Sequence, residues 1–236
     1  MVATQPTSLF FHRMDYRREI DGLRSIAVVP VIFFHAGFSL VSGGYVGVDV
    51  FFVISGYLIT TLLLADLEQG QFSIAHFYER RIRRIVPALL FVILITTVFA
   101  VYYMIPDQVR DYYGSMLSVA GFVSNFYFAA DAGYFGAAPL EKPLLHTWSL
   151  SVEEQFYLLF PLLMMFGWRH GRERVLYWIV LVAIASLIVA ELTHRLLDPE
   201  LAYYLTMGRA WELMLGALIA FQGESLIERK IGRAHV

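Results

Sequence analysis

The chain has 236 residues, of which 58% are hydrophobic and only 16% are charged. Soluble domains carry about 25% charged residues, so this composition excludes an ordinary soluble globular protein and indicates a polytopic membrane protein. The formal net charge of −2 is uninformative, because the charges lie in short patches between long apolar runs. The sequence contains no cysteine, which excludes disulfides, a cysteine nucleophile and thiolate metal sites.

The first apolar segment, residues 25–41, follows a polar stretch, residues 1–17, that is predicted to be a cytoplasmic tail. The segment contains no Asp, Glu, Lys or Arg and lacks a signal-peptide cleavage pattern, so we expect it to remain as the first span. In a helix, Arg24 and His35 would lie on nearly the same face, about 16 Å apart along the axis. His35 would then lie near or beyond the middle of the bilayer, where an ionisable residue is a functional-site hypothesis. The alternative is a histidine hydrogen-bonded inside a helix bundle.

Five further segments are apolar enough to be expected as spans, although the last one is short: residues 45–65, 85–106, 143–167, 175–190 and 210–222. Residues 111–130 are half apolar but are broken by glycine and polar residues. We therefore interpret them as an interfacial or re-entrant segment that makes no net crossing.

Three basic patches test this count, because Lys and Arg favour cytoplasmic loops. They are the amino-terminal arm up to Arg24, the cluster at residues 80–84 and the loop at residues 168–174. All three are cytoplasmic only if residues 107–145 stay on the outer side. The sequence therefore predicts an all-α, single-domain membrane helix bundle with about six transmembrane helices and both ends inside.

A second group of polar residues begins the segment from residue 143. Two adjacent carboxylates, Glu153 and Glu154, lie early in this span, where they are costly unless they are paired or line a wet cavity. Spacings of 3, 4 and 4 predict one helical stripe of polar side chains, with a packing role as the alternative: His146, Ser149, Glu153 and Tyr157.

Asp49 is expected near the outer end of its span, close to the first span because Gly43 and Gly44 form a tight turn between them. An aspartate beside His35 would fix the histidine tautomer and raise its basicity. The equal alternative is that Asp49 caps its own helix. Near the end of the chain, Arg209 and Glu212 are three residues apart, which predicts an ion pair at the entrance of a span.

Four arginines form two pairs on one turn at the cytoplasmic face: Arg80, Arg81, Arg83 and Arg84. Such clusters commonly fix topology and bind anionic lipid. The same arrangement suits a polyphosphate, because arginine is a bidentate donor to phosphate oxygens. The sequence contains no zinc-binding HExxH helix, no GxSxG elbow and no glycine-rich phosphate loop, and no metal site is expected.

Five blocks of sequence occur in an order that resembles the acyltransferase-3 family, and most closely the bacterial peptidoglycan and lipopolysaccharide O-acetylases. The blocks are EIDGLRSIAVVPVIFFH, GGYVGVDVFFVISGYLIT, FYERRIRRIVP, LLHTWSLSVEEQFYLLFP and RAWELMLGAL. Each block alone would be weak, but together they cover most of residues 16–220.

The resemblance implies a multi-pass enzyme of the bacterial inner (cytoplasmic) membrane. Such an enzyme takes an acyl group, usually acetyl, from cytoplasmic acyl-CoA, a co-substrate such as acetyl-CoA and not a bound cofactor. It transfers the group to a carbohydrate on the other side of the bilayer, and no nucleic-acid partner is expected. The family's required pair maps to Arg24 and His35, and its acidic residue maps to Glu153. Its Arg-x-x-Arg element maps to Arg81 and Arg84, with Arg80 and Arg83 as the alternative register.

The chain departs from the family in length, because the family domain has about ten spans. Close relatives often add a soluble esterase-like domain after the membrane part. We therefore interpret residues 18–229 as a partial acyltransferase-3-like domain. Residues 230–236 are interpreted as an artefactual or disordered tail, because 231–236 match a sequencing adapter translated in frame.

Residue chemistry and resemblance agree on a mechanism in outline. His35, held by Asp49 or Glu153, could take a proton from a sugar hydroxyl or carry the acyl group itself, and the sequence does not separate these routes. A rival hypothesis is a proton-coupled transporter or flippase of an envelope precursor, whose membrane His, Asp and Glu form a relay. A third is a non-catalytic membrane scaffold.

Overall fold

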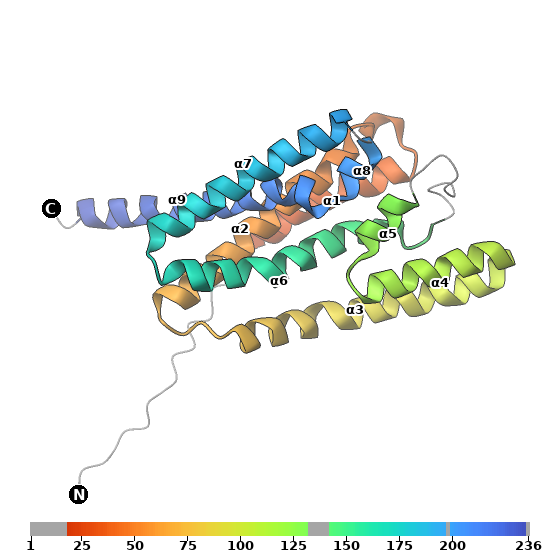
Figure 1. Cartoon of the computed structure of the whole chain (residues 1–236), viewed down its shortest axis with the longest axis horizontal. Helices are drawn as coiled ribbons and strands as arrows, with labels where there is room; N and C mark the ends of the chain where they lie inside the picture. The colour runs from red at the N-terminus through yellow and green to blue at the C-terminus, as the bar shows by residue number, and fades with distance from the viewer. Residues whose placement is uncertain (1–17, 132–141, 197–198, 235–236) are drawn as a thin grey trace, which may run out of the picture.

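The computed structural model describes residues 18–131, 142–196 and 199–234, and within these ranges every regular element is helical. The predicted tail at 1–17, part of the predicted outer segment and residues 235–236 lie outside the described residues. The chain forms an elongated bundle (Figure 1). Its long helices lie along the bundle axis: α1 Arg18–His35, α2 Gly47–Glu68, α3 Ile74–Tyr103, α6 Trp148–Trp168, α7 Arg172–Leu196 and α9 Thr206–Ala234.

The two ends of the bundle differ in the chain segments that they carry. We call the end with the α2–α3 and α6–α7 turns the inner end, since the basic residues at 80–84 and 169–174 gather there. The opposite, outer end carries the end of α1 and the short elements η1 Ser39–Val41, η2 Gly44–Val46, η4 Leu145–Thr147 and α8 Pro199–Tyr204. The described part of the chain thus places the last two predicted basic patches at one end.

Within the part of the chain that the structure describes, three of the predicted spans are long and apolar enough to cross a membrane: Gly44–Glu68, Ile74–Tyr103 and Arg172–Leu196. The helix α1 contributes a shorter apolar stretch, Gly22–His35. The expectation that the first span continues to residue 41 is wrong. Helix α1 ends at His35, and the backbone then turns through Gly37, which adopts a positive φ of 79°. His35 therefore lies at the outer end of its helix and not in its middle.

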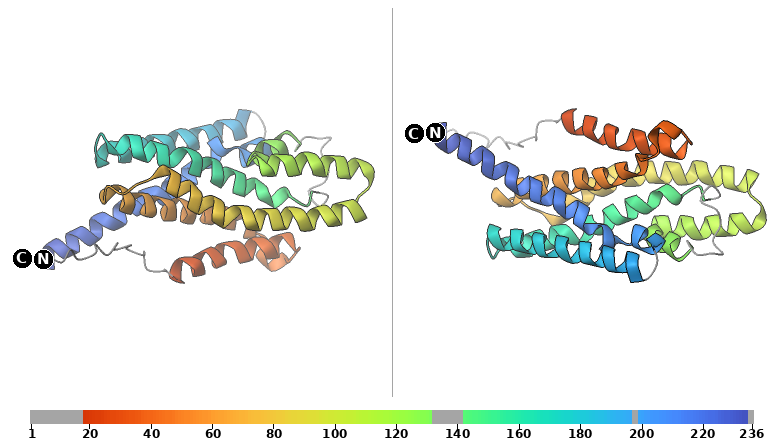
Figure 2. Two further views of the ribbon diagram at one scale, coloured as in Figure 1. Left: turned by 90° about the horizontal axis from the view of Figure 1, so that it is seen from below. Right: turned by 90° about the horizontal axis from the view of Figure 1, so that it is seen from above.

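The segment expected to be re-entrant forms a helical hairpin at the outer side. Helix α4 (Pro106–Ala120) turns back beside α3, and α5 (Ser124–Ala130) leads toward the start of α6 (Figure 2). The hydroxyl of Tyr112 in α4 lies 2.9 Å from that of Thr96 and 2.8 Å from that of Thr97, both in α3. The described part of the predicted outer segment therefore begins and ends on the same side of the bundle.

Helix α2 is the central helix, because glycines let two neighbours approach its backbone. A Cβ atom on Gly47 would overlap the carbonyl oxygen of Ala27 in α1, and one on Gly56 would overlap that of Leu213 in α9. Nine positions separate these glycines, which is two and a half helical turns, so they lie on opposite faces of α2. Helix α9 returns the contact through Gly216, whose Cβ would overlap the carbonyl oxygen of Val53.

The close approach of α2 and α9 predicts a position-specific cost for an added methyl group. Gly216→Ala should destabilise the chain by about 1–3 kcal/mol, because neither backbone can move without separating the two helices. Gly223→Ala on the same helix is the matched control, since nothing lies within 4 Å of its position and alanine favours a helix. Thermal unfolding in detergent measures both. Equal unfolding temperatures for the two variants would contradict the packing described here.

The placement of the inner and outer ends predicts the sidedness of single cysteines in this cysteine-free chain. Leu40, which is 96% exposed, follows α1, and exposed His170 lies in the turn between α6 and α7. Leu40→Cys and His170→Cys should therefore react with a membrane-impermeant maleimide from opposite sides of sealed vesicles. Labelling of both from the same side would overturn this arrangement.

Candidate functional site

His35 is exposed at the outer end of α1, and its own helix orients it. The ring atom Nδ1 lies 2.8 Å from the carbonyl oxygen of Val31, one turn earlier. A carbonyl only accepts hydrogen bonds, so Nδ1 carries the proton in this contact and Nε2 is the unprotonated nitrogen of the neutral ring. The Phe34 ring meets the imidazole edge-on at 5.2 Å. The arrangement leaves Nε2 available as a base or nucleophile.

Arg24 lies on the same helix nearer its inner end. At 1.5 Å per residue, the eleven positions between Arg24 and His35 correspond to about 16 Å along the axis. The guanidinium of Arg24 lies 4.9 Å from the ring centre of Phe51 in α2. Arg24 therefore lies toward the inner end of α1 and is not in contact with the imidazole.

The structure corrects the expectation that Asp49 or Glu153 holds His35. Gly47 faces α1, and Asp49, two positions later, points about 200° away from it. The Asp49 carboxylate, in the first turn of α2, instead accepts a hydrogen bond from Nη1 of Arg209 at 2.7 Å. The Glu153 carboxylate accepts the hydroxyl of Tyr157. The observed partner of His35 is thus a backbone carbonyl.

Arg209 is the centre of an ionic cluster at the outer end of the bundle. The predicted ion pair with Glu212 is present at 2.7 Å, and the same guanidinium nitrogen binds Asp49. Nε of Arg209 donates to the carbonyl oxygen of Tyr203 at 3.1 Å, and the guanidinium lies 4.5 Å from that ring's centre. The Asp49 contact joins residues 160 positions apart, so no local spacing in the sequence could indicate it.

The predicted stripe on α6 is present only in its second half. Glu153 and Tyr157 are both buried and hydrogen-bonded to each other. His146 lies in η4, before α6 begins, and its carbonyl accepts the hydroxyl of Ser149 at 3.2 Å. The His146 imidazole is close enough to His35 to interact electrostatically. His146 therefore belongs with His35 at the outer end, and not with the two buried residues.

The four arginines near the start of α3 differ in what they contact. Arg80 pairs with Asp66 at 3.3 Å, and Arg83 pairs with Glu79 at 2.7 Å. Arg81 is half-buried and lies 4.5 Å from the ring centre of Tyr157 in α6. Arg84 is exposed. The Arg81–Arg84 register therefore has one guanidinium directed into the bundle, whereas both members of the other register are bound to surface carboxylates.

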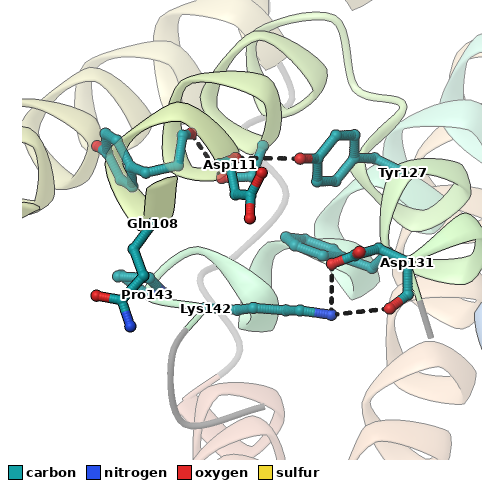
Figure 3. A pocket seen from close by; sticks show the side chains of 9 residues that line it. Gln108, Asp111, Tyr127, Asp131, Lys142 and Pro143 are labelled. Carbon is teal, nitrogen blue, oxygen red and sulfur yellow. Dashed lines mark hydrogen bonds and ion pairs between the residues drawn. The ribbon is translucent and has the colours of Figure 1, made fainter. Parts of the chain in front are cut away.

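A small recess of about 20 Å³ lies where the outer hairpin meets the chain before α6 (Figure 3). Lys142 reaches across it to Asp131, with its Nζ 2.7 Å from the carboxylate and 3.2 Å from the carbonyl oxygen. The Tyr127 hydroxyl donates to the carbonyl of Asp111 at 3.1 Å. Burial raises the pKa of Tyr127, and the carboxylates of Asp111 and Asp131 raise it further. These contacts fasten the hairpin to the bundle, and sequence reasoning did not find them.

Residues 18–131, 142–196 and 199–234 contain no group of three or more His, Asp or Glu side chains that could hold a metal ion. Three sets of titratable groups contain the residues singled out from the sequence. His35 and His146 lie at the outer end, Arg209 with its two carboxylates forms the second set, and Arg81 with Tyr157 and Glu153 forms the third.

Comparison with known proteins gives a consistent family. The acyltransferase-3 family, described as an acyltransferase domain, matches residues 17–234. The chain is 36% identical over 211 residues to the peptidoglycan O-acetyltransferase OatA of Listeria monocytogenes serovar 1/2a, and 37% identical over 210 residues to the O-acetyltransferase OatA of Staphylococcus aureus. It is 34% identical over 218 residues to the putative peptidoglycan O-acetyltransferase YrhL of Bacillus subtilis.

These alignments cover 87–89% of the chain but 34% of each relative, so the chain spans about a third of the length of the curated relatives it matches. No solved structure matches the chain. Because the family match extends over nearly the whole sequence and these relatives exceed 30% identity, this helical membrane chain belongs to the acyltransferase-3 family.

Proposed function

We propose that the chain forms the donor-side and base-bearing part of a bacterial inner-membrane O-acyltransferase. It would move an acetyl group from cytoplasmic acetyl-CoA to a hydroxyl of a cell-envelope carbohydrate. The observation that carries the proposal is the free Nε2 of His35 at the outer end of α1, since its Nδ1 is bound by the Val31 carbonyl. The relatives named peptidoglycan O-acetyltransferase support the reaction class and the carbohydrate acceptor.

His35 would act on the acceptor. Nε2 takes the proton of a sugar hydroxyl as the hydroxyl oxygen attacks the thioester carbonyl carbon. The carbon–sulfur bond then breaks, and the thiolate of CoA leaves with the proton returned from the imidazole. The same nitrogen would serve a two-step route, in which it first carries the acetyl group itself. Both routes need a neutral imidazole whose Nε2 is unprotonated.

The inner end suits the donor because CoA carries several phosphate charges. Arg81 and Arg84 lie one turn apart on α3, and arginine binds phosphate oxygens through paired N–H donors. The Arg81 guanidinium lies 4.5 Å from the centre of the Tyr157 ring, which is a cation–π distance. The Glu153 carboxylate fixes the Tyr157 hydroxyl and therefore the ring under Arg81. Arg24 then lies on the route from this end toward His35.

The proton-accepting role of His35 is tested by His35→Ala in membranes that hold the full product of the gene. Loss of a positioned base lowers a rate by about 10²–10⁴-fold, and transfer of radiolabelled acetyl to envelope glycan should fall by that factor. His170→Ala is the matched control, since its Nδ1 lies 3.1 Å from the Phe166 carbonyl in the same one-turn contact but at the inner turn. Acetyl transfer near the native rate by well-expressed His35→Ala would refute this role. Glycan flux without acetylated product would instead indicate a transporter.

The donor-binding role of the arginines predicts a change in KM for acetyl-CoA and not in kcat. A charge-assisted hydrogen bond contributes about 1.5–3 kcal/mol, so Arg81→Ala should raise this KM by about tenfold or more, and Arg84→Ala should act in the same direction. Arg83→Ala is the control, because Arg83 pairs with Glu79 on an exposed surface, where ion pairs contribute little. The Arg81–Arg84 assignment fails if Arg83→Ala raises KM as much as Arg81→Ala does.

A further inference from the structure

A cleft opens at the outer end of the bundle between the last turn of α7, α8 and the first turns of α9. Its volume is about 400 Å³, and the first turn of α2 also contributes to its wall. Polar and aromatic side chains line it together: Asp49, His194, Tyr203, Arg209, Trp211 and Glu212. The reaction proposed above uses none of this surface.

Glu212, which lines the cleft, has one buried carboxylate oxygen without a hydrogen-bond partner among the described residues. Glu212 is only 1% exposed, and its Oε1 accepts the hydrogen bond from Arg209. Within the described residues, its second oxygen, Oε2, has no hydrogen-bond donor. A buried carboxylate oxygen without a donor is costly, so a ligand that brings an O–H or N–H group to Oε2 would bind favourably.

The charge of the cleft selects against phosphates. Arg209 lies between the carboxylates of Asp49 and Glu212, so the three groups sum to −1 when all are ionised. Glu191 on the rim is paired with Arg195 and adds no net charge. An anionic donor such as CoA would be repelled here, whereas the inner end is rich in arginine. The cleft therefore suits a neutral ligand with several hydrogen-bond donors.

The aromatic residues of the cleft narrow the ligand class. Tyr203 packs against two groups that also contact each other: its ring centre lies 4.8 Å from that of Trp148 and 4.5 Å from the Arg209 guanidinium, which is 5.8 Å from the Trp148 ring centre. Trp211 lines the same cleft. Sugars have an apolar ring face for an aromatic side chain and hydroxyl donors for carboxylates. Both kinds of partner are present in this one cleft.

A surface residue connects the cleft with His35. The cleft and His35 lie on opposite sides of α2, because Asp49 faces α9 whereas Gly47 faces α1. Tyr45 in η2 is 48% exposed, and its ring centre lies 5.6 Å from that of Phe34, the residue before His35. The Tyr45 hydroxyl is also close enough to Tyr203 to interact with it electrostatically. Tyr45, at the outer end of α2, thus lies near both the His35 helix and the cleft.

We propose that this cleft binds one sugar unit of an extended carbohydrate acceptor. The same carbohydrate would pass over Tyr45, so that another of its sugar units reaches His35. The inference rests on the proposed O-acyltransferase function and adds an acceptor subsite remote from the base. It implies that an oligosaccharide binds through two contacts and a monosaccharide through one. The cleft would thereby select long glycans over single sugars.

The test is calorimetric titration of the purified full gene product in nanodiscs with a linear tetramer of N-acetylglucosamine and with the monomer. The native chain should bind the tetramer at least tenfold more tightly than the monomer. Glu212→Gln keeps the shape but removes the charge-assisted acceptor, and it should weaken tetramer binding by about tenfold. Trp211→Leu, which removes the indole from the cleft wall, should weaken it as well. Asp107→Asn is the control, since this exposed residue of α4 lines neither the cleft nor the recess beside the outer hairpin.

Absence of tetramer binding by the native chain, or equal affinities in both cleft variants and the control, would overturn the proposal. Melting curves identify a variant that fails to fold, and the other variant then decides. Release of CoA thiol from acetyl-CoA without acceptor reports on the donor reaction separately. Binding without thiol release would support the cleft while counting against the proposed function. Thiol release without tetramer binding would overturn the cleft alone.

Discussion

The close backbone contact of α2 with α1 and α9 is the constraint that determines where the polar side chains of these helices lie. Gly47 receives α1 on one face and Gly56 receives α9 on the other, each at a distance that a methyl group would prevent. In a bilayer, helices gain little from burying apolar side chains against one another, so close backbone approach by small residues supplies the packing energy. Helix α1 carries His35 and α9 carries Arg209, so α2 sets the distance between the two polar sites.

This arrangement separates two kinds of electrostatic environment along one bundle. At the inner end, arginines exceed the carboxylates that neutralise them, and Arg81 is held over an aromatic ring. At the outer end, one arginine is shared by two carboxylates. A phosphate-bearing donor and a hydroxyl-bearing acceptor would each find a complementary end. In the proposed reaction, donor and acceptor would therefore not compete for one pocket.

The sequence predicted the helices and the pairs that lie within them, because those depend on local spacing. Arg209 and Glu212 pair as their three-residue separation indicates, and Tyr157 reaches Glu153 one turn away. The partner of Asp49 could not be predicted in this way. Asp49 and His35 were predicted to be partners because they were expected at similar depth in the bundle. Contact also depends on the direction in which a side chain points from its helix. The glycines of α2 face its neighbours in such a way that Asp49 points toward α9. The end of α1 was also missed, since Gly37 breaks an apolar run that hydropathy reads as continuous.

The hydrogen bond from His35 to the Val31 carbonyl makes the orientation of the imidazole independent of other helices. In catalytic imidazoles, a carboxylate from a distant part of the chain commonly fixes which ring nitrogen carries the proton. The tautomer then depends on the tertiary fold. Here the donor and acceptor are one turn apart in a single helix. The orientation of the ring is thus set within one helix and needs no partner from elsewhere in the chain. In the proposed reaction, the neighbouring helices could therefore vary with the acceptor without changing how His35 is held.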